Sequence, residues 1–306
     1  MIAPLPELTQ KGLSIERLHA FCKVAEKGGY KEAAPHSESQ QAQFCKQVNQ
    51  LSDYFGVTLT RRQGKKIALT SAGVELARLC REHFIALNDF EGRCKKTPPV
   101  IAVGSGDSLL QWLVLPRLAK IQNDWANHPR IEISNLRTEN IVKRIKDFLL
   151  DFGLIRKIDV PWQCKSEVIG TYSYSIWMPK TLAPPTGPTR LNNFLKTLSF
   201  AVVKTQWGTA FDDLALLAGI KIRVGVLCDS FPQALQTLTA GNYAVVLPNI
   251  VKPFIDETRF VQVQPKFLKA IKDEVCLAWN PRLIKVKTCG EKAVKILSEE
   301  LKFSSS

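Results

Sequence analysis

The stretch SQQAQFCKQVNQL, residues 39–51, decides the fold of the N-terminal part of this chain. Its apolar residues Phe44, Val48 and Leu51 recur at intervals of four and three, which is the spacing of one face of an α-helix. The opposite face carries amides and a lysine, with almost no carboxylate before Asp53. Such side chains can hydrogen-bond to base edges or hold phosphates in a major groove. Taken alone, the same face also fits an ordinary solvated surface.

The segment upstream of this helix predicts two more helical pieces. Residues 14–27 place their apolar side chains on one face, and Gly28-Gly29 ends that helix. A short segment, residues 30–34, stops before Pro35 because the residue before a proline is pushed out of the helical region. The chain therefore begins with a cluster of closely spaced helices.

The segment downstream predicts a β-hairpin. Two short strands are expected at residues 57–60 and 67–70, separated by the sequence RRQGKK. A hairpin that has a glycine at its tip and is flanked by four cations suits contact with a phosphate backbone.

A long helix is expected after the hairpin, from Ser71 to about residue 93. Small and apolar residues recur along it at alternating intervals of four and three, which forms a seam for a partner helix. Two interpretations are open: the seam packs on its own domain, or it joins two copies of the chain.

These segments together resemble the LysR-type transcription regulators. The order LHAFCKVAEKGGYKEAA (18–34), SQQAQFCKQVNQL (39–51) and FGVTLTRRQGKKIALTSAG (55–73) follows the pattern of that family without a gap. The resemblance implies a DNA-binding winged helix-turn-helix. By position, it implies DNA contact from Gln40, Gln41, Gln43 and Lys46 of the recognition helix and from the wing cations Arg61, Arg62, Lys65 and Lys66.

The chain also departs from the family pattern. Swapping a core apolar residue for a small polar one commonly destabilises a domain by a few kcal/mol, which predicts loose packing of this small domain. The changes on the recognition helix leave its DNA sequence preference open. Ser37 and Thr60 stand where the family has apolar residues, and Gln40, Ala42, Cys45 and Lys46 replace its usual serine, proline, serine and arginine.

The remaining two hundred residues alternate strands and helices, which predicts parallel sheets with crossover helices. The resemblance implies two α/β lobes with the architecture of periplasmic binding proteins. The fold class is therefore α/β, with an N-terminal mainly-α winged helix-turn-helix. Strands are expected at residues 100–103, 131–133, 152–155, 200–203, 222–226, 243–247 and 275–279, with helices at residues 109–122, 141–148 and 290–301.

The expected domain boundaries follow from this division. A proline pair after Lys95-Lys96 marks the hinge into the larger part. The expected ranges are residues 1–69 for the winged helix-turn-helix, 70–95 for the linker and dimerisation helix, and 96–306 for the effector-binding domain, with lobe I near 100–180 and 268–306 and lobe II near 181–267.

An effector site is expected between the lobes, at the carboxyl ends of strands. Free amides and hydroxyls at a strand-to-helix turn can hold an anion, although the two serines there also fit a simple helix cap. Asp107 disfavours a carboxylate ligand, so that a cationic, polar or hydroxylated effector stays open. The candidate residues are Ser105, Gly106, Asp107, Ser108, Thr138, Thr205, Gln206, Trp207 and Asp229.

Composition limits the class of protein. The net charge is +14, but residues 1–95 contribute only +4 of it (14 basic less 10 acidic), so charge alone does not mark the end that binds a polyanion. Eight cysteines without a CxxC pair indicate reduced thiols, and Cys94 with Cys228 is one hypothetical redox pair. No secretory segment or membrane span is expected, which predicts a cytoplasmic protein.

Nothing in the sequence favours catalysis. A GxG after the first strand of the effector domain lacks the third glycine of a dinucleotide site, and no metal-ligand spacing is present. We therefore expect no enzyme activity, no cofactor and no metal.

The main hypothesis is a sequence-specific regulator that binds double-stranded DNA and is controlled by a small-molecule effector. It is expected to form a homodimer or homotetramer and not to bind a membrane. One alternative is a degenerate LysR-like protein with weak or non-specific DNA binding. Another is a cytosolic small-molecule binding protein or enzyme on the same scaffold.

Overall fold

The protein forms two compact units, residues 1–97 and residues 98–306, each of which is described by itself. Among the described residues, no helix is both long and apolar enough to cross a bilayer. The computed structural model describes residues 13–64, 66–125, 128–182, 184–204 and 206–304.

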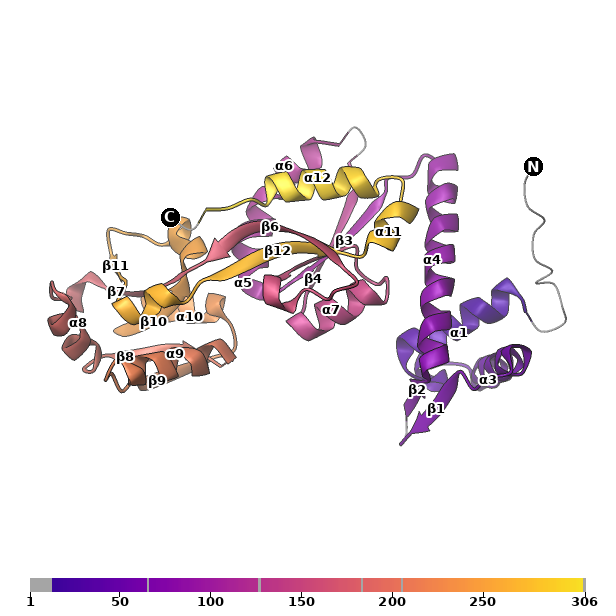
Figure 1. Cartoon of the computed structure of the whole chain (residues 1–306), viewed down its shortest axis with the longest axis horizontal. Helices are drawn as coiled ribbons and strands as arrows, with labels where there is room; N and C mark the ends of the chain where they lie inside the picture. The colour runs from indigo at the N-terminus through magenta and orange to yellow at the C-terminus, as the bar shows by residue number, and fades with distance from the viewer. Residues whose placement is uncertain (1–12, 65, 126–127, 183, 205, 305–306) are drawn as a thin grey trace. The chain divides into compact units, whose positions relative to one another are not determined.

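Unit 1 contains the helices that the sequence predicts, and local capping sets their ends. The Ser14 hydroxyl accepts a hydrogen bond from the Arg17 amide at 3.3 Å at the start of the first helix. Gly28 (φ 77°) and Gly56 (φ 66°) end the first and third helices in the left-handed region, which glycine adopts without a Cβ clash. The elements are α1 (Ile15–Lys27), α2 (Tyr30–Ala33), α3 (Glu38–Phe55), β1 (Thr60–Gln63), β2 (Lys66–Leu69) and α4 (Ser71–Cys94), shown in indigo and purple in Figure 1.

The core of unit 1 lies where α1, α3 and α4 meet, around the fully buried Phe21, Val48 and Leu51. The two polar departures from the family pattern have polar neighbours. Ser37 is the N-cap of α3, and its hydroxyl accepts from the Gln40 amide at 3.2 Å. Burial raises the pKa of the Tyr30 phenol, and interaction with the Thr60 side chain opposes that rise.

The hairpin differs from its expected position. The strand predicted at residues 57–60 begins only at Thr60, so Arg61 and Arg62 lie within β1 and not in the loop. The reason is that Gly56 ends α3 and the next residues lead out of that helix, with the Val57 amide still bonded to the Ser52 carbonyl. Arg61 and Arg62 are consequently held on a paired strand.

The seam of α4 divides into two halves. Gly73, Ala77 and Cys80 are buried against their own unit, whereas Leu87 and Phe90 farther along are each 57% exposed. Both interpretations of the seam therefore have a physical basis, one for each half of the helix.

Unit 2 contains two five-stranded sheets, which we call lobe I and lobe II. The long strands β6 and β12 run along the middle of the unit, where the chain crosses between the sheets (Figure 1). Lobe I has the order β4 (Arg130–Asn135), β3 (Val100–Ser105), β5 (Phe152–Arg156), β12 (Asp273–Trp279) and β6 (Lys165–Tyr172). Lobe II has the order β11 (Phe260–Val263), β7 (Tyr174–Pro179), β10 (Tyr243–Pro248), β8 (Ser199–Val203) and β9 (Arg223–Cys228).

The helices of unit 2 cover these sheets. In lobe I, α7 packs on β3 and β5, and α12 packs on β6 and α6 (Figure 1). In lobe II, α10 packs on β8 and β10. The helices are α5 (Asp107–Leu109), α6 (Leu118–Asn123), α7 (Thr138–Lys146), α8 (Pro188–Leu195), α9 (Gln206–Leu217), α10 (Phe231–Ala240), α11 (Pro281–Val286) and α12 (Gly290–Glu300).

Three expectations for unit 2 need correction. The sheets are mixed, because β12 and β6 in lobe I and β7 and β11 in lobe II run antiparallel to their neighbours. The boundary of lobe I expected near residue 180 falls at Ser173, since β7 already pairs within lobe II. The single helix expected at residues 109–122 is broken by a π-helical turn and a 3₁₀ turn, the latter containing Pro116, which lacks the amide proton that a helix needs.

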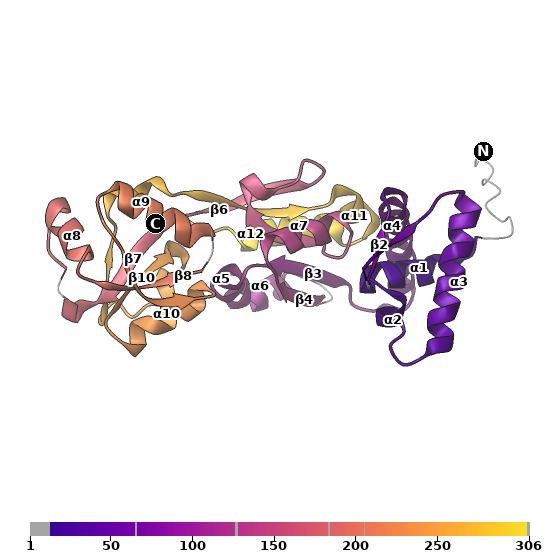
Figure 2. The ribbon, with the colours of Figure 1, turned by 90° about the horizontal axis from the view of Figure 1, so that it is seen from below.

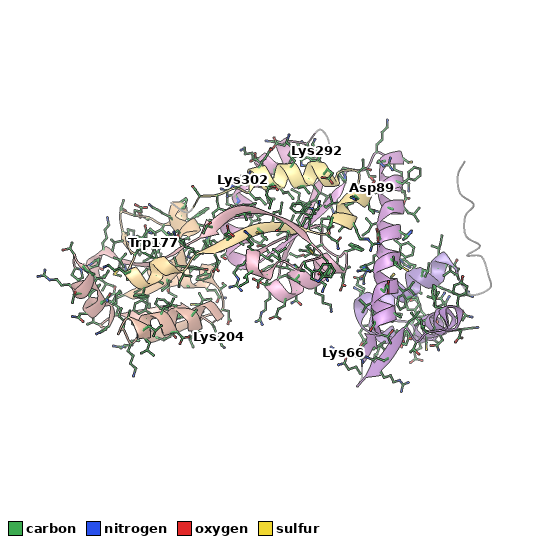
Figure 3. The ribbon with its side chains drawn as sticks, viewed as in Figure 1. Lys66, Asp89, Trp177, Lys204, Lys292 and Lys302 are labelled. Carbon is green, nitrogen blue, oxygen red and sulfur yellow. The ribbon has the colours of Figure 1, made fainter. Side chains whose placement is uncertain are left out.

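A continuous apolar core runs through both lobes and includes Tyr172 and Tyr174 at the crossing point. Trp177, labelled in Figure 3, is fully buried inside lobe II. The two lobes thus share packing through the crossover strands.

Candidate DNA interface and effector site

The exposed face of α3 carries three side chains that are free to contact a ligand. Gln40, Gln43 and Lys46 are exposed, and within the described residues none of their side chains makes a hydrogen bond or ion pair. Phe44, Val48 and Leu51 hold the opposite face in the core. The helix therefore presents polar donors and acceptors on a rigid support.

Gln41 differs from its neighbours. Its amide nitrogen donates to the Ala34 carbonyl at 2.8 Å, and the side chain is half-buried. This bond ties α3 to the end of α2 and leaves the side-chain oxygen of Gln41 available as an acceptor.

The wing adds positive charge beside this helix within unit 1. Arg61 pairs with Ala68 and Arg62 with Ile67 across the hairpin, so successive arginines point to opposite faces of the two-stranded sheet. Arg61, Arg62 and Lys66 are exposed and form no ion pair among the described residues; Figure 3 labels Lys66. Lys65 lies outside the described residues. The Ile67 amide donates to the Gly28 carbonyl at 3.1 Å, which anchors the hairpin to the end of α1.

In unit 2, the first strand-to-helix turn holds a buried hydroxyl without a partner. Ser105 ends β3 with 0% exposure, and its Oγ makes no hydrogen bond in the described part of the chain. Burying a hydroxyl without a hydrogen bond costs about 1–3 kcal/mol, and such groups are rare in folded proteins. This turn is therefore a candidate for ligand contact.

The turn faces the crossover strands and lobe II. The Ser108 hydroxyl lies 3.5 Å from the Tyr172 hydroxyl, and the ring of Tyr174 lies 6.1 Å from the ring of Phe231 at the start of α10. Helix α10 also packs against α5 (Figure 2). Burial raises the pKa of both Tyr172 and Tyr174, so the two phenols stay protonated at neutral pH.

The other predicted effector residues that the structure describes follow strands of both lobes. Gly106 and the half-exposed Asp107 begin α5, and Thr138 begins α7, two residues beyond Leu136, whose amide donates to the Ser105 carbonyl at 2.9 Å. In lobe II, the exposed Asp229 precedes α10, and its amide donates to the Gln233 side chain at 2.9 Å. Gln206 and Trp207 form the first turn of α9, and Thr205 lies outside the described residues.

A polar network behind the tyrosines was not predicted from the sequence. The Ser175 hydroxyl donates to Asn249 Oδ1 at 2.8 Å, and Asn249 Nδ2 donates to the Ser173 hydroxyl at 2.7 Å. Gln262 Nε2 donates to the Ser175 hydroxyl at 2.8 Å. These bonds join β7, β11 and the end of β10 beside the crossing point, so every member of the network is paired.

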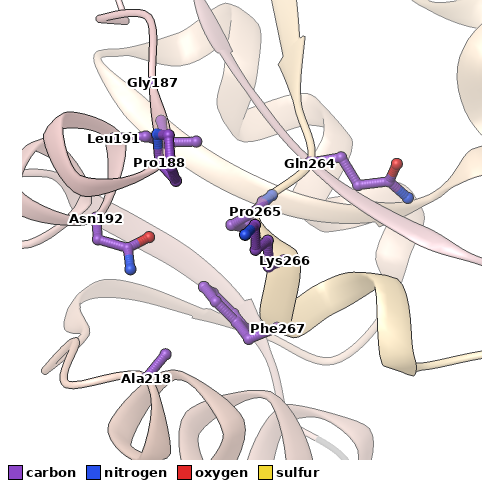
Figure 4. A pocket seen from close by; sticks show the side chains of 9 residues that line it. All are labelled: Gly187, Pro188, Leu191, Asn192, Ala218, Gln264, Pro265, Lys266 and Phe267. Carbon is purple, nitrogen blue, oxygen red and sulfur yellow. The ribbon is translucent and has the colours of Figure 1, made fainter.

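A separate cavity of about 340 Å³ lies in lobe II (Figure 4). Leu191 and Asn192 of α8, Ala218 after α9 and Phe267 line it, with Pro265 and Lys266 on the segment that leads toward β12. Its lining contains none of the residues expected to bind an effector.

Two family models match the chain. "Bacterial regulatory helix-turn-helix protein, lysR family" matches residues 15–74, and "LysR substrate binding domain" matches residues 97–284. The matched ranges cover well over half of the chain; the first lies within unit 1, and all but the first residue of the second lies within unit 2. The chain belongs to the LysR family.

Relatives and solved structures agree with this assignment. The chain is 29% identical over 147 residues to a probable nitrogen assimilation transcriptional activator of Synechococcus elongatus, a match covering 47% of each chain. The chain spans about half the length of the curated relatives it matches. Full-length OxyR from Pseudomonas aeruginosa, a point variant, has a TM-score of 0.66 at 16% identity over 95% of each chain. ArgP from Mycobacterium tuberculosis has a TM-score of 0.64 at 14% identity, over 95% of this chain and 99% of its own. The structures show a shared fold, and the expected family and fold class are confirmed.

In this LysR family chain, the sequence did carry a signal for the missed crossover residues. The run Tyr172-Ser173-Tyr174-Ser175 alternates aromatic and hydroxyl side chains, which is the period of a strand with two different faces. The pairing partners Asn249 and Gln262 lie more than seventy residues away, so no local pattern pointed to them.

Proposed function

We propose that this protein is a ligand-controlled transcription regulator that binds double-stranded DNA through α3 and the wing. The observation that carries the proposal is the face of α3, where exposed amides and Lys46 lack partners, next to three wing cations that form no ion pair among the described residues. Glutamine can bond adenine through two hydrogen bonds, and cations bind phosphates. A duplex DNA partner also implies a cytoplasmic protein.

The proposal includes a dimer formed through α4. Leu87 and Phe90 expose large apolar surfaces on the half of the helix that its own unit leaves uncovered. A second copy would bury them as a coiled-coil pair and would place two α3 helices on a pseudo-palindromic site.

The experiment that tests DNA binding is fluorescence anisotropy with the full chain and the DNA upstream of its own gene, with scrambled DNA as control. We expect a preference of about a thousandfold or more, since this is the lower range for specific regulators. Absence of binding to either DNA at low salt contradicts the proposal.

The same proposal places an effector between the lobes, at Ser105 and Ser108 opposite α10. The ligand that fits is polar, hydroxylated or cationic, because the turn offers hydroxyls and the carboxylate of Asp107. Ser105 is fully buried, so ligand contact requires a rearrangement of the segments around this turn. Such a movement couples binding to lobe closure when the two states differ in ligand affinity.

Replacing Ser105 tests its role in ligand binding without an expected loss of stability. Ser105→Ala removes an unpaired buried hydroxyl, so we expect the free energy of unfolding to stay equal or to rise by about 1 kcal/mol. Ser298→Ala in α12 is the matched control, because its hydroxyl is also buried without a partner in the described chain. Both variants and the wild type are screened by thermal shift against amino acids, polyols and nucleosides.

A stabilising compound is expected to protect the wild type and Ser298→Ala, while its thermal shift disappears in Ser105→Ala. Equal protection of all three proteins would place the site elsewhere.

A further inference from the structure

Two buried cysteines lie on the first and last helices of unit 1, which pack against each other. Cys22 lies on α1 and Cys80 on α4, and both are buried, with exposures of 8% and 6%. The Cys22 thiol donates to the Ala77 carbonyl at 4.0 Å, and Cys80 follows three residues later on the same face of α4. Each thiol is near enough to the other to perturb its pKa.

The surroundings of the two thiols shift their pKa values in opposite directions. Interaction with Cys80 and burial raise the pKa of Cys22, which holds its proton. The same interaction, aided by the positive charge of Arg81, lowers the pKa of Cys80 against the opposing effect of burial. Because the thiolate is the nucleophilic form, Cys80 is the sulfur that reacts first.

We propose that Cys22 and Cys80 are a redox-active dithiol that forms a reversible disulfide between α1 and α4 on exposure to a peroxide. The Cys80 thiolate attacks one oxygen of hydrogen peroxide, the O–O bond breaks, and protonation of the leaving hydroxide gives a sulfenic acid and water. The Cys22 sulfur then attacks the Cys80 sulfur, so that the S–S bond forms as the S–O bond of the sulfenic acid breaks, and the Cys22 proton leaves with the hydroxide as a second water. Two thiols and one peroxide thus become one disulfide and two waters, and a thiol reductant reverses the change.

The position of the pair gives the disulfide a structural effect. Helices α2 and α3 and the wing all lie between Cys22 and Cys80 in the chain, so the bond closes a loop that contains them. Closing a loop of this length restricts the unfolded chain and stabilises the folded one. The expected rise in the melting temperature of unit 1 is on the order of 10 °C. This proposal does not depend on DNA binding.

The test uses the full chain, treated with increasing hydrogen peroxide, blocked with N-ethylmaleimide and digested with trypsin without reduction. Cys22 falls in the peptide of residues 18–23 and Cys80 in that of residues 79–81, each with a single cysteine. The expected product is these two peptides joined, from a protein that still migrates as a monomer on a non-reducing gel, and dithiothreitol abolishes it. Cys94→Ala is the matched control, because Cys94 is exposed on the same helix and should leave the product unchanged.

Two further measurements test which sulfur reacts first and whether the disulfide raises the melting temperature. In Cys22→Ala, dimedone should trap a sulfenic acid on Cys80, whereas in Cys80→Ala it should leave Cys22 unlabelled. Circular dichroism at 222 nm of the wild type, to which both units contribute, should show a helical transition that rises in temperature on oxidation and returns with reductant, while the tryptophan fluorescence transition, which reports unit 2, stays unchanged. Absence of the joined peptide when Cys94 is already fully oxidised overturns the proposal, and dimedone labelling of Cys22 in Cys80→Ala overturns the assigned order of attack.

Discussion

Lys287→Met is expected to lower the free energy of unfolding of unit 2 by about 3–5 kcal/mol, because it leaves a buried carboxylate without its counter-charge. Lys287 Nζ lies 2.7 Å from Asp151 Oδ2 and donates to the Val100 carbonyl at 3.0 Å. The same carboxylate oxygen accepts from the Ala102 amide at 2.8 Å. The pair therefore joins the segment after α11 to β3 and to the start of β5.

Burial explains the size of the effect. The side chains of Asp151 and Lys287 are 5% and 19% exposed, so water cannot replace the missing ammonium group. Lys120 with Glu300 is an ion pair of unit 2 in which the lysine is well exposed, and exposed pairs contribute about 0–1 kcal/mol. The Asp151–Lys287 pair should therefore matter far more than a surface pair of this kind.

Chemical denaturation followed by tryptophan fluorescence measures this change. All six tryptophans lie in unit 2, so the signal reports that unit alone. Lys285→Met is the control, because Lys285 is exposed on α11, and its expected effect is within about 0.5 kcal/mol. Adding Asp151→Asn to Lys287→Met should restore part of the stability, since the amide carries no charge. A destabilisation by Lys287→Met no larger than that by Lys285→Met would show that the pair does not hold this part of lobe I.

The sequence predicted unit 1 well because local chemistry sets its helix ends. Ser14, Gly28 and Gly56 act within one turn of the helices that they begin or end, so their effect is visible in a short window. The wing strands were misplaced by a few residues because the exit from α3 leaves no comparable signal in residues 57–59. The resemblance implied DNA contact from Gln41, but the bond of its side chain to the Ala34 carbonyl depends on how α2 and α3 pack.

Unit 2 was predicted less completely because its key contacts join distant residues. The apolar strands were evident, whereas the crossover at Ser173 has no proline or glycine turn to mark it. Asp151 directly precedes an apolar strand in the sequence, but its partner Lys287 lies 136 residues later. The strand-to-helix pattern predicted the turn at Ser105. The proximity of the Tyr172 phenol to Ser108 could not be predicted, because only the folded chain brings these two residues together.

Substitutions on the exposed face of α3 are expected to weaken DNA binding. Gln43→Ala removes a side chain proposed to read a base, so the affinity for the upstream DNA should fall by about 1–3 kcal/mol per half-site, roughly 5- to 150-fold. Its affinity for scrambled DNA should not change. Lys46→Ala removes a proposed phosphate contact and should weaken binding to both DNAs alike.

The salt dependence of DNA binding tests the central claim most directly. The logarithm of the association constant is plotted against the logarithm of salt concentration for the wild type, Gln43→Ala, Lys46→Ala and the control Lys295→Ala, which removes the same charge from an exposed position on α12. The slope for Lys46→Ala should be shallower by about 0.9 for each phosphate that the lysine neutralises in the wild type, whereas Gln43→Ala and Lys295→Ala should keep the wild-type slope. Identical slopes for Lys46→Ala and Lys295→Ala, together with unchanged sequence preference in Gln43→Ala, would contradict the assignment of α3 as the DNA-reading helix.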